Sequence, residues 1–173
     1  MKILVTGGLG FVGSTLVDRL VKSGNEVTVV DNLSSASSSE EYRNTFVNYI
    51  IDDIKNIKKS DFNEYFDVIY HLAGLARIQP SFENPLSYVE VNIVGTAIIC
   101  ELAKKHNAKL IYSSSSSINN GEFKTPYTFS KWGGEAVLET WRECYSLDAS
   151  ICRFYNVYGP VSYTHLTLPT SYA

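Results

Sequence analysis

The segment that most constrains this 173-residue chain is a glycine-rich turn near its beginning, Thr6-Gly-Gly-Leu-Gly-Phe-Val-Gly-Ser14. A short apolar run precedes it and an amphipathic run follows it, which predicts a strand, a tight turn and a helix in that order. Gly7 can take the turn, Gly10 lets a ligand approach the backbone, and Gly13 lets the helix lie close to the sheet. The helix N-terminus directs N–H groups at an anion, so the pattern predicts a pyrophosphate site. A second reading of the same stretch, G-x-G-x-x-G, begins at Gly8.

An acidic residue ends the next apolar run. Asp31 follows Val27-Thr-Val-Val30, about twenty residues beyond the glycines, where a carboxylate can bond the hydroxyls of an adenosine ribose. The same carboxylate would repel a 2′-phosphate, and no Lys or Arg occurs over residues 31–42. The two observations favour NAD over NADP. An Asp that simply opens a serine-rich turn is the alternative.

Apolar and amphipathic runs alternate along the chain. Strands are expected over 2–6, 26–31, 46–51, 67–71, 108–113 and 148–154, and helices over 11–23, 84–106 and 125–146, with a weaker helix over 55–61. Asn84-Pro85 would begin the second helix and Asn107 would end it. This alternation predicts an α/β fold with a doubly wound, Rossmann-like parallel sheet, and the length suits one domain.

Composition narrows the class of partner. The chain is 45% hydrophobic and 19% charged with a formal charge of −3, which does not suggest a nucleic-acid partner. Its three cysteines lack paired metal-ligand spacing, so no metal site is expected, and they are expected to be reduced thiols in apolar surroundings of a cytoplasmic protein. No signal peptide and no apolar run of membrane-spanning length is expected.

A tyrosine and a lysine are spaced for acid–base chemistry. Tyr127 and Lys131 lie one turn apart at the beginning of a predicted helix, which puts both side chains on one face. A Lys ammonium favours a neighbouring phenolate, and so does a bound nicotinamide cation, so Tyr127 could act as a general base. The serine run 113–117 leaves the fifth predicted strand at its carboxyl end, where such sheets bind ligands. Taken singly, each of these residues could equally be packing or loop.

These segments, in their order, resemble the extended short-chain dehydrogenase/reductase family, and within it the NAD-dependent nucleotide-sugar epimerases and dehydratases of the UDP-glucose 4-epimerase type. The other segments that carry the resemblance are Asn32-Leu33, Asp53-Ile54, His71-Leu-Ala-Gly74, Asn92 with Gly95-Thr96, and Arg153-Phe-Tyr-Asn-Val-Tyr-Gly-Pro160. The match therefore runs over nearly the whole chain, from Lys2 to Pro160.

The resemblance implies roles for individual residues. Ser115, Tyr127 and Lys131 would be catalytic. The cofactor-binding residues would be Gly7, Gly10, Phe11, Val12, Gly13, Asp31, Asn32, Asp53, Ile54, Leu72, Ala73, Gly74, Asn92, Ser113, Tyr127, Lys131, Phe154 and Tyr155. Ser115 and Asn156 would contact the nucleotide sugar. His71 is expected to be structural because it closes a buried strand, and Asn92 could alternatively fill a helix kink.

The residues after Ser115 bear on the reaction. Dehydratases and decarboxylases of this family place acidic residues there, whereas this chain has Ser116 and Ser117, with Glu122 as the one nearby carboxylate. The resemblance therefore favours a 4-epimerase, in which Tyr127 takes the proton of the sugar 4-hydroxyl while hydride moves to NAD and returns to the other face of the keto intermediate. A dehydratase or reductase of the same family, or a non-catalytic NAD-binding module, are the alternatives. Residues 118–121 replace the family's Val-Tyr-Gly and longer loop, which leaves the sugar open.

The resemblance ends at Pro160. Residues 1–160 are expected to form the NAD-binding domain, and residues 161–173 resemble translated sequencing adapter and are expected to be non-native, a natural loop being the alternative. Family members build much of the sugar pocket from a C-terminal domain, and the resemblance implies that this domain is missing here. The chain is therefore expected to bind NAD, whereas catalytic turnover is not expected of it with the sugar pocket incomplete. Helices 84–106 and 125–146 would form a homodimer interface in the full-length protein.

Overall fold

The computed structural model describes residues 1–34, 43–58, 62 and 65–158. The segment expected to be non-native, residues 161–173, lies outside the described residues, as does Pro160. The expected NAD-binding domain is therefore described over most of its length.

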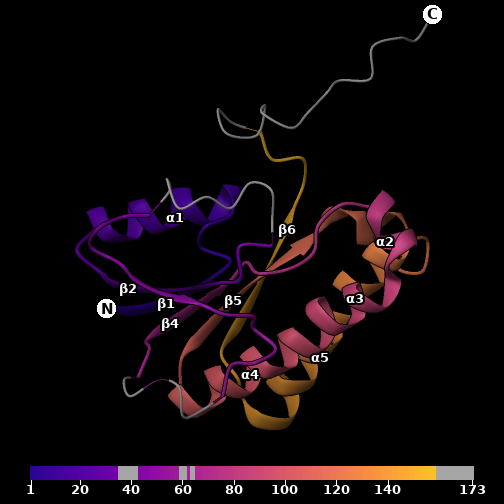
Figure 1. Cartoon of the computed structure of the whole chain (residues 1–173). Helices are drawn as coiled ribbons and strands as arrows, with labels where there is room; N and C mark the ends of the chain where they lie inside the picture. The colour runs from indigo at the N-terminus through magenta and orange to yellow at the C-terminus, as the bar shows by residue number, and fades with distance from the viewer. Residues whose placement is uncertain (35–42, 59–61, 63–64, 159–173) are drawn as a thin grey trace, which may run out of the picture.

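Six parallel strands form one sheet (Figure 1). They are β1 (Lys2–Thr6), β2 (Glu26–Asp31), β3 (Asn48–Ile51), β4 (Val68–His71), β5 (Lys109–Ser115) and β6 (Ala149–Phe154), in the spatial order β3-β2-β1-β4-β5-β6. Every strand pair is parallel. The order reverses between β1 and β4, and such a reversal opens a crevice at the carboxyl ends of the strands. The doubly wound sheet predicted from the sequence is confirmed.

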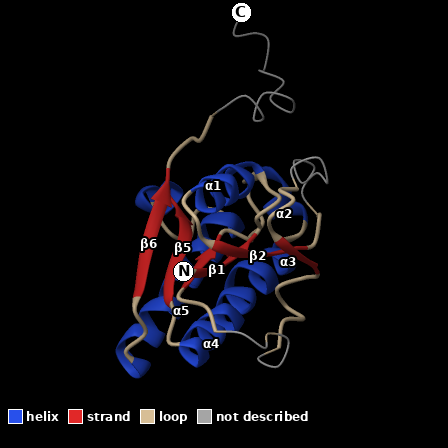
Figure 2. Cartoon of the chain, turned by 90° about the vertical axis from the view of Figure 1, so that its left-hand side faces the viewer, coloured by secondary structure: helices blue, strands red, loops and turns tan. Residues whose placement is uncertain are grey.

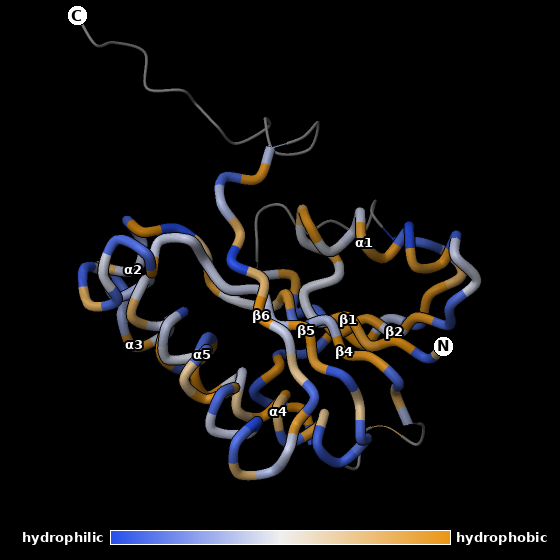
Figure 3. Tube along the Cα trace, turned by 180° about the vertical axis from the view of Figure 1, so that it is seen from behind, coloured by the Kyte–Doolittle hydropathy of each residue, from blue (hydrophilic) through white to orange (hydrophobic). Residues whose placement is uncertain are grey.

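Helices cover both faces of the sheet (Figures 1 and 2). The helix α1 (Phe11–Lys22) lies on one face, and α4 (Gly95–His106) and α5 (Pro126–Tyr145) lie on the other. Strand β1 contributes side chains to the hydrophobic core on both faces of the sheet. Ile3 and Val5 join the cluster under α1, whereas Leu4 joins the cluster on the opposite face. The hydropathy colouring accordingly shows apolar strands at the centre of the molecule (Figure 3).

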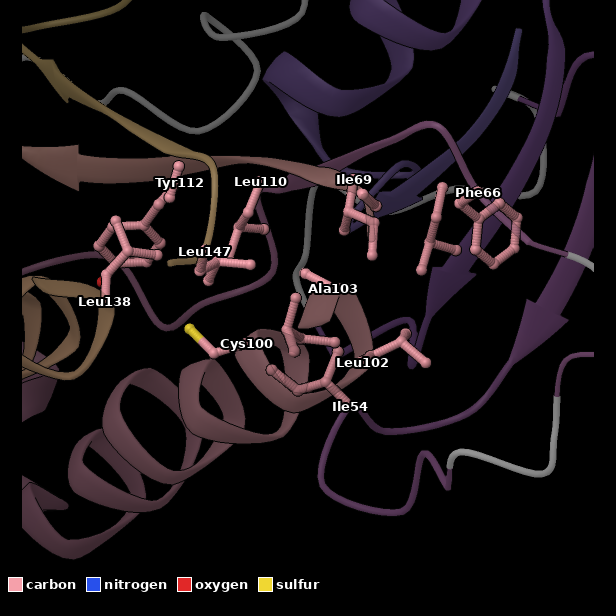
Figure 4. Close-up of a cluster of buried hydrophobic side chains, with 14 of the residues drawn as sticks. Ile54, Phe66, Ile69, Cys100, Leu102, Ala103, Leu110, Tyr112, Leu138 and Leu147 are labelled. Atoms are coloured by element: carbon pink, nitrogen blue, oxygen red, sulfur yellow. The ribbon is translucent and has the colours of Figure 1, made fainter. Parts of the chain in front are cut away.

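The larger cluster lies between the sheet and α4–α5 (Figure 4). Ile69 and Leu110 of the sheet face Cys100 and Ala103 of α4, and Leu138 of α5 closes the cluster. Each fully buried aliphatic side chain of this kind contributes about 1.5–3 kcal/mol. This packing fixes α5, and with it Tyr127 and Lys131, against the sheet.

The second predicted helix contains an unpredicted π-helical turn. The chain forms α3 (Pro85–Val89), the π-turn η2 (Glu90–Val94) and then α4 without a break. Close packing surrounds this turn, because a Cβ on Gly133 would lie 2.9 Å from Ile93 Cγ1 and a Cβ on Gly134 would lie 2.9 Å from the Asn92 carbonyl oxygen. Asn84 is the N-cap and Pro85 begins the helix, as predicted, although the Asn84 side chain makes no capping hydrogen bond.

Asn107 ends α4 in the left-handed conformation, with φ of +50°, as predicted. A helix was expected over residues 55–61. This expectation is wrong for residues 55–58, the part that the structure describes, because residues 54–56 form a turn and no helix follows. Aspartate side chains explain the difference, since Asp53 Oδ1 accepts from the Lys55 N–H at 2.9 Å and Asp52 Oδ1 accepts from the Asp53 N–H at 2.7 Å. Two short helices were not predicted, α2 (Gln79–Glu83) and the 3₁₀ turn η3 (Ser116–Asn120).

The three cysteines are all free thiols. Cys100 is buried, but Cys144 and Cys152 are exposed, so the expectation of apolar surroundings is wrong for these two. Across the described residues, no group of three or more His, Cys, Asp and Glu side chains could hold a metal ion.

The continuous helix Pro85–His106 has the length and composition of a membrane span, with a hydropathy of 1.5. The helix is not an uninterrupted apolar run, because Glu90, Asn92 and Glu101 lie within it. Part of its apolar surface packs inside the fold, because Ile99, Cys100, Leu102 and Ala103 belong to the core cluster under the sheet, whereas Leu86 and Val94 are exposed. Burial against the sheet thus accounts for part of its apolar composition.

Candidate cofactor and active site

A cavity of about 560 Å³ lies at the carboxyl ends of β1, β2 and β4. Twelve residues predicted to bind the cofactor line it: Gly7, Gly10, Phe11, Val12, Gly13, Asp31, Asn32, Asp53, Ile54, Leu72, Ala73 and Gly74. The sequence did not indicate the remaining lining residues, which are Val30, Ser34, Asp52, Lys55, Leu75, Ala76, Ser87 and Val91. Segments far apart in the chain thus meet where the strand order reverses.

The glycine turn forms one wall of the cavity. Gly7 has a φ of +73°, and a Cβ there would lie 2.6 Å from a backbone nitrogen of the loop after β4. A Cβ on Gly13 would collide with the Gly7 carbonyl oxygen, whereas Gly10 has only that oxygen nearby, at 3.3 Å. Gly8 packs against Val29 and does not line the cavity. The 7–10–13 spacing is therefore the one that shapes the site.

The N-terminus of α1 suits an anion. Gly10 is its N-cap, no side chain caps the helix, and no acidic residue lies in its first turn. The first intrahelical bond runs from the Ser14 N–H to the Gly10 carbonyl oxygen at 2.9 Å. The N–H groups of Phe11 and Val12 precede that bond, and these residues line the cavity. A pyrophosphate fits this cradle.

Asp31 has a structural task that the sequence did not reveal. Its Oδ2 accepts from the Leu9 N–H at 2.9 Å and its Oδ1 accepts from the Leu33 N–H at 2.9 Å. The side chain is buried yet lines the cavity. Because each carboxylate oxygen has more than one acceptor position, Asp31 can hold the glycine turn and still accept from a ligand hydroxyl.

A second group of polar residues forms the wall at the carboxyl end of β2. Asn32 Nδ2 donates to Asp53 Oδ2 at 3.1 Å, and Ile54 is buried behind them. Lys55 Nζ lies 3.5 Å from Glu90 Oε2, which joins this wall to the π-turn. The predicted pair Asp53 and Ile54 is thus part of the cavity, and Lys55 extends it.

Lys131 lies behind Gly74, at the junction between the cavity and α5. Its Nζ donates to the Ser113 carbonyl oxygen at 3.1 Å, and a Cβ on Gly74 would lie 3.0 Å from that Nζ. Lys131 is buried, and burial lowers its pKa to about 8. The ammonium form therefore still predominates at pH 7.

Asn92 joins the cavity to α5. Its Oδ1 accepts from the Leu75 N–H at 2.8 Å, and its Nδ2 donates to the Leu75 carbonyl oxygen at 3.0 Å and to Ser130 Oγ at 2.9 Å. Ser130 Oγ in turn donates to the Tyr127 carbonyl oxygen at 2.8 Å. Asn92 therefore occupies the π-turn, in keeping with the alternative that it fills a helix kink, and it fixes a cavity-lining segment. Its contact with the cofactor stays a prediction.

His71 lies in a buried chain of hydrogen bonds. Thr96 Oγ1 donates its one proton to the Asn92 carbonyl oxygen at 2.7 Å. In the hydrogen bond between Thr96 and His71, the donor must therefore be the N–H at His71 Nε2. His71 Nδ1 then accepts from Thr6 Oγ1 at 2.7 Å. Burial, and secondarily the charge of Lys131, lower the pKa of His71 to about 3. A neutral histidine with both nitrogens bonded supports the structural role expected for it.

Ser115 and Tyr127 come from neighbouring elements. Ser115 ends β5, and its Oγ donates to Ser117 Oγ at 2.9 Å and accepts from the Ser117 N–H at 3.2 Å, which begins η3. Tyr127 lies half-buried in the first turn of α5, after the capping residue Thr125. The Lys131 bond to the Ser113 carbonyl ties α5 to the same strand.

The cavity lining does not include eight of the predicted site residues, which are Asn92, Ser113, Ser115, Tyr127, Lys131, Phe154, Tyr155 and Asn156. Phe154, Tyr155 and Asn156 are exposed at the end of β6, and Tyr155 is 74% exposed. Asn119 Nδ2 donates to Tyr155 Oη at 3.4 Å and its Oδ1 accepts from Arg153 Nη1 at 3.0 Å. Their contacts with cofactor and nucleotide sugar stay predictions.

Comparisons with known proteins agree on one family. A model of the NAD dependent epimerase/dehydratase family matches residues 3–170. The UDP-glucose 4-epimerase of Mycolicibacterium smegmatis is 32% identical over 92% of this chain and 57% of its own length. The structure of the Thermotoga maritima UDP-glucose 4-epimerase with UDP-glucose superposes with a TM-score of 0.87 at 32% identity, covering 92% of this chain and 57% of the other.

A dehydratase is similar too. The NAD-dependent NDP-hexosamine 5,6-dehydratase of tunicamycin biosynthesis superposes with a TM-score of 0.83 at 28% identity, over 92% of this chain and 56% of that one. The chain spans a little over half the length of the curated relatives that it matches. The shared part is therefore the parallel sheet with its cavity.

Proposed function

Because this chain belongs to the NAD-dependent epimerase/dehydratase family, we propose that it is the NAD-binding part of a nucleotide-sugar 4-epimerase, of the UDP-glucose/UDP-galactose type. One observation carries the proposal: the glycine-turn cavity and the Tyr127–Lys131 helix adjoin at Gly74, whose Cα faces Lys131 Nζ. This arrangement would hold the proposed cofactor site against the proposed general base.

The cavity residues are suited to NAD. Gly10 and the uncapped N-terminus of α1 would hold the pyrophosphate, and Asp31 would accept from the adenosine ribose hydroxyls. Asp53 and Ile54 would flank the adenine. When bound, NAD supplies the hydride acceptor and donor and is regenerated in each cycle. The negative charge of Asp31 disfavours a 2′-phosphate at the same place.

The chain's own groups would handle the proton. Tyr127 would take the proton of the sugar 4-hydroxyl, and the Lys131 ammonium one turn away would favour the phenolate. Ser115 Oγ would donate a hydrogen bond to the same sugar oxygen, in place of its bond to Ser117 Oγ. The carbon is inverted when hydride returns to the other face of the 4-keto group, and Tyr127 would then return its proton to the sugar oxygen.

The segment after Ser115 favours epimerisation over dehydration. Ser116 and Ser117 occupy the first positions of η3, and neither can supply a carboxylate for elimination. The similarity to an NDP-hexosamine dehydratase keeps dehydration as the second candidate, with Glu122 as the nearby acid. A reductase and a non-catalytic NAD-binding module are the remaining alternatives.

An assay of the full-length gene product with UDP-glucose separates these candidates. Formation of UDP-galactose without net NADH supports the proposal, net NADH consumption indicates a reductase, and a dehydrated product indicates a dehydratase. Tight NAD binding without turnover indicates a binding module. Tyr127→Phe and Lys131→Met should each abolish turnover, while Tyr49→Phe, on β3 away from the cavity, should not.

Three further expectations belong to this proposal. The full-length protein would be a cytoplasmic homodimer that pairs through α4 and α5, which sedimentation of the purified protein tests. Residues 161–173 would be non-native sequence, although the family match extends to residue 170. Resequencing the locus from independent DNA tests this, because recovery of the same residues would contradict it.

A further inference from the structure

We propose that Tyr88, in α3, is a positioning residue that links the rim of the NAD cavity to Tyr127. Tyr88 is one of the buried residues of α3 and was not indicated by the sequence. Its hydroxyl group contacts one part of the site and its ring contacts another. The inference rests on the proposed function, because its target is the proposed general base.

The hydroxyl group holds the rim of the cavity. Tyr88 Oη donates to the Arg77 carbonyl oxygen at 3.0 Å and lies 3.3 Å from the Ala76 carbonyl oxygen. Arg77 has a φ of +100°, a backbone conformation that residues other than glycine rarely adopt. Contacts from the surrounding structure are therefore needed to hold it. Leu75 and Ala76 line the cavity. The Tyr88 hydroxyl thus fixes the segment directly beyond the cavity wall.

The ring of Tyr88 meets the ring of Tyr127. The two ring centroids are 6.3 Å apart and the planes lie at 87°, the edge-to-face arrangement that aromatic pairs favour. The helices that carry them, α3 and α5, lie side by side (Figure 1). Tyr88 is 3% exposed, so its ring is a fixed surface against which the half-buried Tyr127 ring rests.

The same helical segment forms part of the cavity wall. Ser87 precedes Tyr88, Val91 follows it by three residues, and both line the cavity. Asn92, one residue further, holds Leu75 from the other side. The segment that lines the cavity therefore also carries Tyr88, whose side chain contacts both the backbone of Ala76 and Arg77 and the ring of Tyr127.

Two substitutions separate the two contacts. Tyr88→Phe removes the hydroxyl group and keeps the ring, whereas Tyr88→Leu removes both. Tyr49→Phe is the matched control, because the Tyr49 hydroxyl also bonds backbone, accepting from the Asn44 N–H at 2.9 Å, but lies on β3. Each variant is made in the full-length protein, and NAD affinity, kcat, KM and the ¹³Cζ resonance of Tyr127 are measured.

We expect Tyr88→Leu to lower kcat by about tenfold or more, since it displaces a general base, and to change KM by less than about twofold. The Tyr127 resonance should shift in this variant. Tyr88→Phe should keep kcat and the resonance near those of the parent, but weaken NAD binding by about threefold to tenfold, because the Arg77 and Ala76 carbonyls lose their donor.

A purely structural Tyr88 gives a different result. Both variants would then lower the thermal midpoint while kcat, NAD affinity and the Tyr127 resonance stay those of the parent, and this outcome overturns the inference. If Tyr88→Leu does not fold, NAD affinity of Tyr88→Phe still decides the hydroxyl contact. If the parent forms no epimer, the proposed function fails, whereas the resonance and NAD affinity continue to test Tyr88.

Discussion

The Asp31 carboxylate accepts a hydrogen bond from the Leu9 N–H at 2.9 Å and fastens the glycine turn to the end of β2. Its second oxygen holds Leu33, whose φ is +56°. The residue that we propose sets the preference for NAD therefore also holds the turn that we propose receives the pyrophosphate. In that proposal, cofactor preference and turn geometry are coupled through one side chain.

Substitution of Asp31 should consequently affect both folding and binding. Asp31→Ala leaves two backbone N–H groups without their acceptors, so the free energy of unfolding should fall by about 1–3 kcal/mol, and NAD binding should weaken. Asp31→Asn keeps one acceptor oxygen, so its unfolding free energy and its NAD affinity should lie between those of the parent and those of Asp31→Ala. Urea unfolding and calorimetric NAD titration measure the two effects. Asp18→Asn, at an exposed carboxylate that accepts from Asn44, serves as control.

Gly10 and Gly13 should respond differently to the same added methyl group. A Cβ on Gly13 would meet the Gly7 carbonyl oxygen and would lie 2.8 Å from Gly8 Cα, so Gly13→Ala should lower the free energy of unfolding by about 1–3 kcal/mol. A Cβ on Gly10 would lie 3.3 Å from the Gly7 carbonyl oxygen, a tight contact that a shift of a few tenths of an ångström relieves, but it would enter the space that we propose for the pyrophosphate. Gly10→Ala should therefore stay stable and lose NAD affinity. Equal stability losses in the two variants would contradict this assignment.

Much of the fold follows from the pattern of the sequence. Parallel strands buried on both faces are short apolar runs, so each of the six strands was predicted to within two residues. Strand β5 continues to Ser115 because its last residues pair with Arg153 and Phe154, and a run of serines carries no local strand signal. The twelve cavity residues could also be predicted, because they follow strands or glycines at known spacings.

Other features come from tertiary contacts that a single sequence does not display. The π-turn depends on how Ile93 meets Gly133 and how Asn92 meets Leu75, residues far apart in the chain. Tyr88 has the spacing of an ordinary core aromatic, and only its contacts with Arg77 and Tyr127 distinguish it. The hydrogen bond from the Lys55 backbone N–H to the Asp53 carboxylate likewise outweighed the helical pattern over 55–58.

His71 should make stability depend on pH. Its pKa falls from 6.5 to about 3 on folding, chiefly through burial, so the unfolded chain binds a proton that the folded chain excludes. The resulting stabilisation is complete above pH 6.5 and is lost as the pH falls toward about 3. Between pH 7 and pH 5 the loss should be about 2 kcal/mol.

The variant His71→Gln isolates this effect, because glutamine does not titrate. The difference in unfolding free energy between the parent and His71→Gln should shrink as the pH is lowered, while the contributions of all other groups cancel. Urea unfolding at pH 7, 6 and 5 provides the measurement. A difference that stays constant over this range would show that His71 does not exclude a proton on folding.

Arg153 and Glu135 form a two-pronged ion pair that fastens the end of β6 to α5, with Nε–Oε1 at 2.8 Å and Nη2–Oε2 at 2.6 Å. The Glu135 side chain is 8% exposed and that of Arg153 44%. Burial raises the pKa of Glu135, but the hydrogen bonds and charge of Arg153 outweigh it and leave the pKa lowered. Removing Arg153 alone therefore leaves a buried carboxylate without its partner.

Arg153→Met should lower the free energy of unfolding by about 1–2 kcal/mol, less than for a fully buried pair because the guanidinium is partly solvated. A double-mutant cycle with Glu135→Gln should show coupling, whereas the exposed pair Arg142 and Glu139, at 3.0 Å, should show almost none. Since the pair lies outside the cavity, NAD affinity should persist. The KM for nucleotide sugar should rise, because Asn156, which we propose contacts the sugar, lies three residues beyond Arg153. A loss of NAD affinity with an unchanged KM would mean that this end of β6 serves the cofactor rather than the sugar.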